Sequence, residues 1–164
     1  MSELTGERQV ILVSSRSHME IMGKDIEKDD IITIAWHMPV SFDPQLYAVS
    51  IGKTRYSCGL IQKSKSFVVN FVSPDLKDQA IFCGTHSGDH IDKFKDSGLT
   101  IEEASSIDCG RIKEALGYLE CEVINEVDAG DHIIFLGKVI SSDLKKTGKR
   151  LFQGTKKDFT TTEY

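Results

Sequence analysis

The segment from Ser50 to Ser57 reads SIGKTRYS and gathers two cations and several hydroxyls around a glycine. It stands between a β-like stretch and a helix-like stretch. Backbone amides at a strand end, the N-terminus of a helix and an arginine side chain are groups that hold phosphate in proteins. The alternative is a solvated turn, but no Asp or Glu occurs from Pro44 to Pro74, and this favours the phosphate.

Two further segments contain residue types that suit a flat organic ligand. Ala35 to Ser41, AWHMPVS, places an aromatic ring among small polar groups just after a predicted strand. Such a loop can hold a heteroaromatic ring, although by itself it is better explained as an ordinary loop. Gly84 to Phe94, GTHSGDHIDKF, has small residues that let the backbone approach a ligand, and Lys93 could reach an anion.

Gly130-Asp131-His132 places a histidine directly after a tight-turn signal, at the start of a predicted strand. A histidine in this position is most often structural. It could also face a site and donate a hydrogen bond there, because an imidazole ring carries a donor at neutral pH. The sequence leaves both interpretations open.

The motifs of several enzyme classes are absent from the sequence. Gly52-Lys53-Thr54 resembles the end of a phosphate loop, but the required earlier glycine is replaced by Tyr47. The patterns G-x-G-x-x-G, G-x-S-x-G and H-E-x-x-H do not occur, which argues against a Rossmann nucleotide site and gives no signal for a hydrolase or a zinc protease. A Ser/His/Asp triad stays open, but nothing in the sequence points to one. The cysteines are Cys58, Cys83, Cys109 and Cys121. They show no C-x-x-C spacing and no cluster with histidines, so we predict reduced thiols and no metal site.

The charge of the chain is unevenly distributed. The formal net charge is −5 at pH 7, which argues against binding to nucleic acid. Two acid-free blocks, 44–74 and 144–157, hold half of the 20 basic residues and none of the 25 acidic ones. An acidic protein with such blocks can bind a small anion locally, but a buried strand pair and a loose tail explain them equally well. No apolar run approaches the ~18 residues of a membrane-spanning helix, and the opening MSELTGERQV has no apolar leader, so we expect a cytoplasmic protein outside the membrane.

Length and hydrophobic patterning predict one mainly β domain. The 164 residues are about one domain's worth. Strands are expected at 8–14, 30–36, 46–52, 66–72, 117–127 and 132–142. Helical segments are expected at 56–64, 74–83 and 91–95, and a loop at 37–44. Consecutive strands with short helices inserted favour an antiparallel barrel.

Four segments in register resemble the FMN-binding split-barrel family of flavin reductase-like proteins. They are AWHMPVSFDP, LYAVSIGKTRYSCGLIQKSKSFVVNFVSPDL, SGDHIDKF and ALGYLECEVINEVDAGDHIIFLGKV. The match extends over about residues 8–155 and leaves 156–164 as a C-terminal tail, so 1–164 are expected to form a single domain. The resemblance implies a mainly β, six-stranded antiparallel Greek-key split barrel with two or three short helices. It also implies a homodimer with FMN near the subunit interface.

The resemblance further implies roles for particular residues. The flavin ring and ribityl chain would be bordered by Ala35, Trp36, His37, Met38, Pro39 and Ser41, and the phosphate would be held by Ser50, Gly52, Lys53, Arg55 and Ser57. The site would be closed by Ser87, Gly88, Lys93 and Phe94, and His132 would lie where a nicotinamide docks. Trp36 and His37 stand where many relatives have small residues or Asn, which bears on the access of the hydride donor.

The implied function is that of an oxidoreductase. NAD(P)H would reduce bound FMN, which would pass electrons to free flavin, a ferric chelate or a partner protein. Flavin supplies this chemistry itself, so the protein need supply only binding, orientation and electrostatics. The alternative is a flavoredoxin-type electron carrier reduced by a protein donor such as ferredoxin, which the bulky Trp36 and His37 favour. A split-barrel domain without flavin is the third interpretation.

Overall fold

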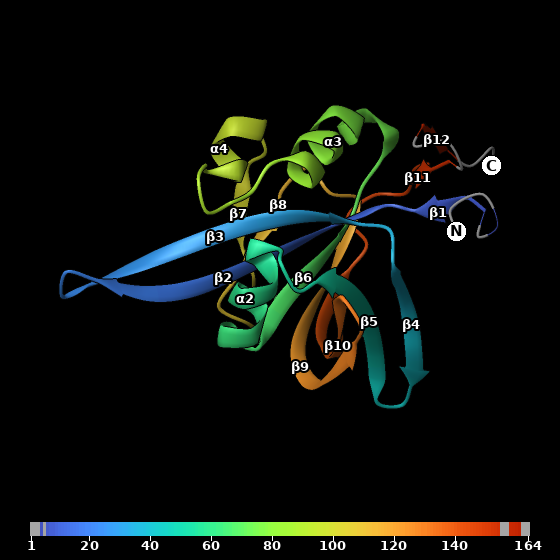
Figure 1. Ribbon diagram of the computed structural model, residues 1–164. Helices are drawn as coiled ribbons and strands as arrows, with labels where there is room; N and C mark the ends of the chain where they lie inside the picture. Colours follow the sequence, from blue (N-terminus) through green and yellow to red (C-terminus); the bar gives the residue numbers. More distant parts are fainter. Residues whose placement is uncertain (1–3, 5, 155–157, 162–164) are drawn as a thin grey trace.

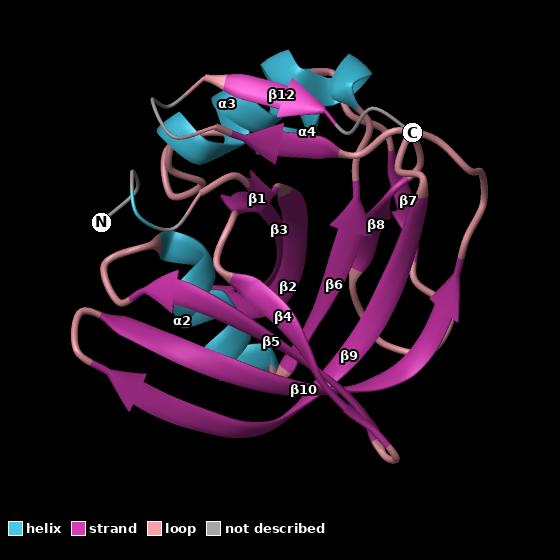
Figure 2. Cartoon of the chain, turned by 90° about the vertical axis from the view of Figure 1, so that its right-hand side faces the viewer, coloured by secondary structure: helices cyan, strands magenta, loops and turns pink. Residues whose placement is uncertain are grey.

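The computed structural model describes residues 4, 6–154 and 158–161, and antiparallel strands dominate it (Figure 1). Seven strands form one sheet in the order β3–β2–β6–β9–β10–β5–β4. Their bounds are β2 Ile11–Ile21, β3 Lys24–Ile34, β4 His37–Phe42, β5 Gln45–Gly52, β6 Ser66–Phe71, β9 Gly117–Ala129 and β10 His132–Asp143. Figure 2 shows these strands curving round a common interior, as in a barrel.

Smaller elements complete the fold. The remaining strands are β1 Arg8–Gln9, β7 Ile101–Glu103, β8 Gly110–Ile112, β11 Leu151–Gln153 and β12 Phe159–Thr161. The helices are α2 Tyr56–Ser64, the 3₁₀ turn η1 Pro74–Leu76, α3 Lys77–Thr85 and α4 Lys93–Ser97. Part of the predicted tail forms β12, which pairs with β11, while 156–157 and 162–164 lie outside the described residues. Within the part of the chain that the structure describes, no helix is long and apolar enough to cross a bilayer.

The prediction of a mainly β antiparallel fold with a few short helices is confirmed, but the sheet has seven strands rather than six. The additional strand is β4, so the prediction of a loop at 37–44 was wrong. Pro39 is tolerated because β4 is an edge strand, and a register shift between Pro39 and Ser41 absorbs the irregularity. Pairing with β5 therefore decides the conformation of a segment whose local sequence is typical of a loop.

The hairpin of β2 and β3 extends beyond the barrel as an arm, at the left of Figure 1. The strands run well past their predicted ends, through a stretch rich in charged residues. Arg16 explains how this stretch is held. Its guanidinium is buried at the root of the arm, 3.0 Å from Asp29 and 2.7 Å from Glu103. Hydrogen bonds to these carboxylates raise the pKa of Arg16, so the guanidinium stays charged.

Strand β3 lies between two apolar cores, and these cores fix the end of the strand in place. Side chains alternate along a strand, so Ile32 and Ile34 face the barrel interior while Ile31 faces α3 and α4. The Thr33 hydroxyl donates a hydrogen bond of 2.5 Å to the Ala80 carbonyl of α3. The end of β3 is thereby fixed against both the barrel and the helix.

Gly137 of β10 provides a test of the packing inside the barrel. A Cβ atom at this position would lie 2.6 Å from the Phe67 ring and 2.8 Å from the Cβ atom of Cys121. Gly137→Ala should therefore lower the free energy of unfolding by about 1–3 kcal/mol. Gly59→Ala is the matched control, because Gly59 lies exposed in α2 with open space at its Cβ, and this change should raise the same quantity by about 0.5–1 kcal/mol. Chemical denaturation measures both, and an undiminished stability of the Gly137 variant would contradict the packing.

Candidate functional site

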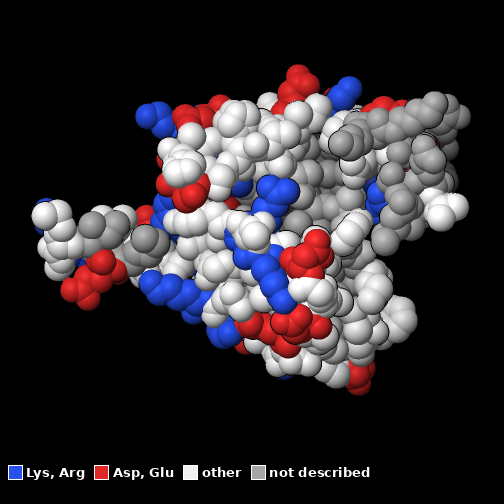
Figure 3. Space-filling view, viewed as in Figure 1, with Lys and Arg blue, Asp and Glu red and all other residues white. Residues whose placement is uncertain are grey.

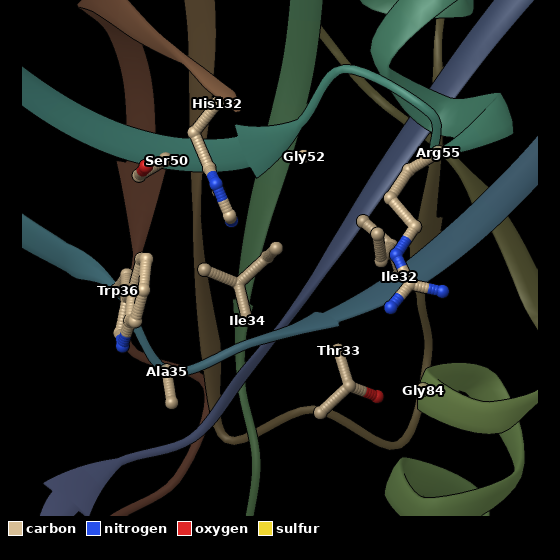
Figure 4. A pocket seen from close by; sticks show the side chains of 10 residues that line it. All are labelled: Ile32, Thr33, Ile34, Ala35, Trp36, Ser50, Gly52, Arg55, Gly84 and His132. Atoms are coloured by element: carbon tan, nitrogen blue, oxygen red, sulfur yellow. The ribbon is translucent and has the colours of Figure 1, made fainter. Parts of the chain in front are cut away.

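A groove lies between the end of β3, the end of β5 and the start of β10 (Figure 4). Its first hollow, of about 190 Å³, is lined by Ile32, Thr33, Ile34, Ala35, Trp36, Ser50, Gly52, Arg55, Gly84 and His132. A second hollow of about 190 Å³ shares Ile32, Arg55 and Gly84 with the first and continues toward α2 and the loop after α3. The two hollows form one groove, and Figure 4 shows Arg55 and His132 reaching into it from different elements.

The second hollow, called here the anion end, offers groups that suit a phosphate. Its lining includes Arg55, Ser57 and Ser87 beside the first turn of α2. The first amides of a helix have no intrahelical acceptor and carry the positive end of the helix dipole. The first turn of α2 contains no acidic residue and no capping side chain. Among the described residues the Arg55 side chain has no hydrogen bond or ion pair, so it is available to an anion.

Lys53, which the sequence assigns to the phosphate, points away from the groove. Its ammonium lies 2.8 Å from Asp128 on the β9–β10 hairpin. Figure 3 shows Lys and Arg side chains over α2 and the loop before it, with acidic side chains directly beside them. The acid-free block of the sequence therefore meets acids from a distant hairpin in space, and only part of its positive charge faces the groove.

The residues expected to close the site divide between the groove and the core. Ser87 and Lys93 line the anion end, but Lys93 is only 3% exposed and its ammonium lies 3.2 Å from Asp30. Phe94 packs in the core beneath the helices. Gly88 is pressed against Asp30, because a Cβ at Gly88 would lie 2.0 Å from a carboxylate oxygen. Only glycine allows the loop to approach so closely.

His132 is positioned by two neighbours at the other end of the groove. Its Nδ1 atom lies 2.7 Å from a carboxylate oxygen of Asp131, and its ring centroid lies 4.9 Å from that of Trp36. Because a carboxylate accepts, Nδ1 donates in this pair, and the same hydrogen bond lowers the pKa of Asp131. The Nε2 atom faces the groove beside Gly52. A histidine and an aromatic ring thus flank a space where a planar ring could lie.

His37 does not face the groove but joins its own strand, β4, to β1 and β5. Its Nε2 atom lies 2.9 Å from the Gln9 carbonyl oxygen, and its Nδ1 atom lies 2.6 Å from the Tyr47 hydroxyl. Burial lowers the pKa of His37 and raises that of Tyr47 to about 12, so both are neutral near pH 7. Nε2 therefore donates to Gln9, and Nδ1 accepts from Tyr47. This histidine fixes β1 against β4 and β5.

The other residues of the AWHMPVS segment lie on two sides of Trp36. Ala35 and Trp36 line the groove. Met38 and Pro39 line a separate hollow of about 370 Å³, which shares Ala35 and Trp36 with the groove. Ser41 follows the irregularity in β4 and lines neither. The indole of Trp36 is thus the wall between two spaces.

A fourth hollow, of about 530 Å³, adjoins the groove through Thr33, Ala35 and Gly84. It lies between α3 and β12, and its other lining residues are Val10, Lys77, Ala80, Ile81, Thr85, Gln153, Asp158 and Phe159. Small-molecule sites usually measure about 300–1,000 Å³. The groove and this hollow together have room for a ring system larger than a phosphate.

The sequence does not single out Asp30, and it names Gly84 only as the first of the small residues in the segment 84–94 that let the backbone approach a ligand. In the structure Gly84 lines both hollows of the groove, and Asp30 lies behind the second hollow in contact with Lys93 and Ser57. A Cβ at Gly84 would lie 3.2 Å from that of Thr33, so the glycine lets α3 approach β3. Asp30 begins the apolar run DIITIAW, and a single acid at the start of a buried strand is the signal that could have indicated a paired carboxylate.

Burial also decides the state of the thiol at the anion end. Cys83 lines this hollow, and burial raises its pKa to about 11. The thiol is therefore neutral near pH 7 and neither repels an anion nor acts as a nucleophile.

Comparison with known proteins identifies the domain type of this chain and several relatives. A model of the flavin reductase like domain matches residues 7–159. The chain is 36% identical over 137 residues to an uncharacterized protein of Archaeoglobus fulgidus, over 82% of this chain and 76% of that protein. It is 27% identical over 118 residues to the NADH-dependent FMN reductase AsuE2 of Streptomyces nodosus subsp. asukaensis, over 69% of this chain and 60% of that reductase.

A solved structure agrees with the fold. The flavoredoxin of Desulfovibrio vulgaris (Miyazaki F) superposes with a TM-score of 0.83 at 18% identity, over 96% of this chain and 88% of that one. At this identity the likeness shows the fold alone, and the fold is the antiparallel split barrel. Because the domain match extends over nearly the whole chain, the protein belongs to the flavin reductase like family.

Proposed function

We propose that this protein binds FMN and uses it to transfer electrons from NAD(P)H. The observation that carries the proposal is the groove, which joins an anion end at Arg55 to a space beside Trp36 and His132. FMN has the matching chemistry, since it is a planar ring system linked by a ribityl chain to a phosphate. The electrons would then pass to free flavin, a ferric chelate or a partner protein.

The residues of the groove fit the parts of FMN. Arg55 and the first turn of α2 would hold the phosphate by charge-assisted hydrogen bonds. Ser50 and Gly52 line the middle of the groove, where a ribityl chain would run, and Ala35 offers a small wall to the ring. When bound, FMN would supply acceptance of a hydride and release of electrons singly or in pairs. The groove residues would bind it, orient it and exclude water.

His132 would dock the nicotinamide ring of the hydride donor. Asp131 accepts from Nδ1 and so holds the imidazole with Nε2 toward the groove. A donor or acceptor at that atom can orient a carboxamide group. The likeness to an NADH-dependent FMN reductase supports a pyridine nucleotide as the donor.

Trp36 favours a second candidate function, that of a flavoredoxin-type carrier without pyridine-nucleotide activity. Its indole is 48% exposed and packs against His132 at the side of the groove where a nicotinamide would enter. A protein donor such as ferredoxin could pass electrons to the flavin without entering the groove. The two candidate functions share the FMN site and differ only in the electron donor that reduces the bound FMN.

An apolar face next to the groove supports assembly of two copies. Trp36, which directly precedes β4, and Met38 in β4 are two residues apart and therefore lie on one face. A row crosses the sheet from Trp36: the Ser50 amide of β5 donates to its carbonyl, Ser50 pairs with Ile134 of β10, and Ile134 pairs with Val127 of β9. Met38 is 58% exposed and Val127 45% exposed. Apolar patches of this kind mark association sites. A homodimer through this face would cover the open side of Trp36 and complete the wall of the groove.

The reduction of bound FMN tests the function. Purified protein loaded with FMN should lose the visible flavin absorption when NADH or NADPH is added without oxygen. Trp36→Ala should bleach faster than the unchanged protein, because the smaller side chain opens the approach to His132. Stopped-flow absorption measures both. Unchanged protein that stays yellow with either nucleotide, yet bleaches with reduced ferredoxin, would refute the reductase and leave the carrier.

Two substitutions should separate binding from reduction. Arg55→Ala should raise the FMN dissociation constant about tenfold or more, since a charge-assisted hydrogen bond contributes roughly 1.5–3 kcal/mol. His132→Ala should slow reduction by NAD(P)H more than it weakens FMN binding. Lys53→Ala is the matched cation control, because its ammonium pairs with Asp128 outside the groove. Equal FMN affinity in the Arg55 and Lys53 variants, by fluorescence titration, would contradict the phosphate assignment.

The oligomeric state tests the apolar face. Sedimentation should give a dimer for the unchanged protein and a monomer for Val127→Asp, because a carboxylate in a buried contact lacks a partner. Ile26→Asp is the control, since Ile26 is similarly exposed but lies on the arm of β2 and β3. A monomeric unchanged protein would refute the dimer, and a dimeric Val127 variant would exclude this face.

A further inference from the structure

Beneath the anion end lies a buried ion pair that no part of the proposed reaction uses. Asp30 of β3 is 0% exposed, and its Oδ1 atom lies 3.2 Å from the ammonium of Lys93, which is 3% exposed. The Oδ1 atom makes no directed hydrogen bond to a described residue. Lys93 instead donates to the Ile31 carbonyl at 2.6 Å. The pair is therefore held chiefly by charge.

Asp30 also connects the walls of the anion end. Its second carboxylate oxygen accepts a hydrogen bond from the Ser57 hydroxyl in the first turn of α2. Gly88 of the loop after α3 covers its first oxygen. Ser57 and Lys93 both line the anion end. One buried carboxylate thus lies directly behind the two walls that a bound phosphate would contact.

The charges at the anion end follow from this arrangement. Two cationic side chains, Arg55 and Lys93, line the hollow. Asp30 compensates Lys93, whereas Arg55 has no such partner among the described residues. Charges out of contact with water act on each other more strongly than charges on the surface. A phosphate in the hollow would therefore experience one uncompensated cation rather than two.

We propose that Asp30 is a specificity-determining residue that limits the affinity of the anion end for a phosphate monoester by cancelling the charge of Lys93. The inference rests on the proposed function, because it takes the phosphate of FMN as the ligand. Its consequence is a flavin that exchanges with solution, since the phosphate adds less affinity over neutral riboflavin than two cations would give. The ratio of the FMN and riboflavin affinities reports this contribution, because the two ligands differ only in the phosphate.

Three variants test the role of Asp30 by titration of FMN and of riboflavin into each protein. Asp30→Asn keeps an acceptor for Ser57 but removes the charge, so FMN should bind about tenfold more tightly while riboflavin changes little. Lys93→Gln leaves Asp30 uncompensated, so FMN should bind about tenfold more weakly, again without a matching change for riboflavin. The double variant, Asp30→Asn with Lys93→Met, is neutral like the native pair and should return the ratio to that of the unchanged protein.

The ratio separates an electrostatic role from a structural one. Loss of packing would weaken both flavins together and leave their ratio unchanged. Thermal melting shows which variants are folded. If Asp30→Asn does not fold, Lys93→Gln still tests the electrostatic role, because it changes the net charge of the same pair in the opposite direction. If the ratio of FMN to riboflavin affinity were the same in every folded variant, the proposed role of Asp30 would be overturned and the proposed function would stand. Failure of the unchanged protein to bind either flavin would overturn the proposed function and this inference together.

Discussion

The pairing of β5 with β10 is the constraint on which the site depends. Strand β10 begins with His132 opposite Gly52, the last residue of β5. The Lys53 amide then donates to the Asp131 carbonyl at 2.9 Å, which ties the loop after β5 to the hairpin turn. Arg55 and His132 thereby reach one groove from distant parts of the chain. A slip of one residue in this pairing would turn His132 to the opposite face of the sheet. His132 and Arg55 would then no longer face the same groove.

Several acidic side chains satisfy buried cations and loop amides. Burial of a charge is costly unless the charge is paired and hydrogen-bonded. Glu120 is fully buried and accepts hydrogen bonds from the Ser105 and Ser106 amides and from Arg111 at 3.0 Å. Asp30 does the same for the walls of the anion end. Among the residues that the structure describes, Arg55 is the groove cation without a carboxylate partner, which suits a small anion rather than a polyanion.

The sequence predicts the local parts of this site better than their assembly. The helix at 56–64 has its predicted bounds, because turn and helix signals are local. Lys53 and His37 do not face the groove as the sequence predicts. Lys53 pairs with Asp128, and His37 bonds to Gln9 and Tyr47, and these partners come from elsewhere in the chain. Asp30 is missed for the same reason, since its partner Lys93 lies far along the sequence. Long-range polar pairing, which leaves no periodic pattern, is what the sequence alone does not reveal.

A crystal structure of the protein with FMN bound tests the central claim most directly. That claim is that one groove holds the phosphate at Arg55 and the ring beside Trp36 and His132. The predicted result is a phosphate within hydrogen-bond distance of the Arg55 guanidinium and the first-turn amides of α2, with the ring extending along the groove. An FMN bound elsewhere, or one with its phosphate directed away from Arg55, would contradict the account.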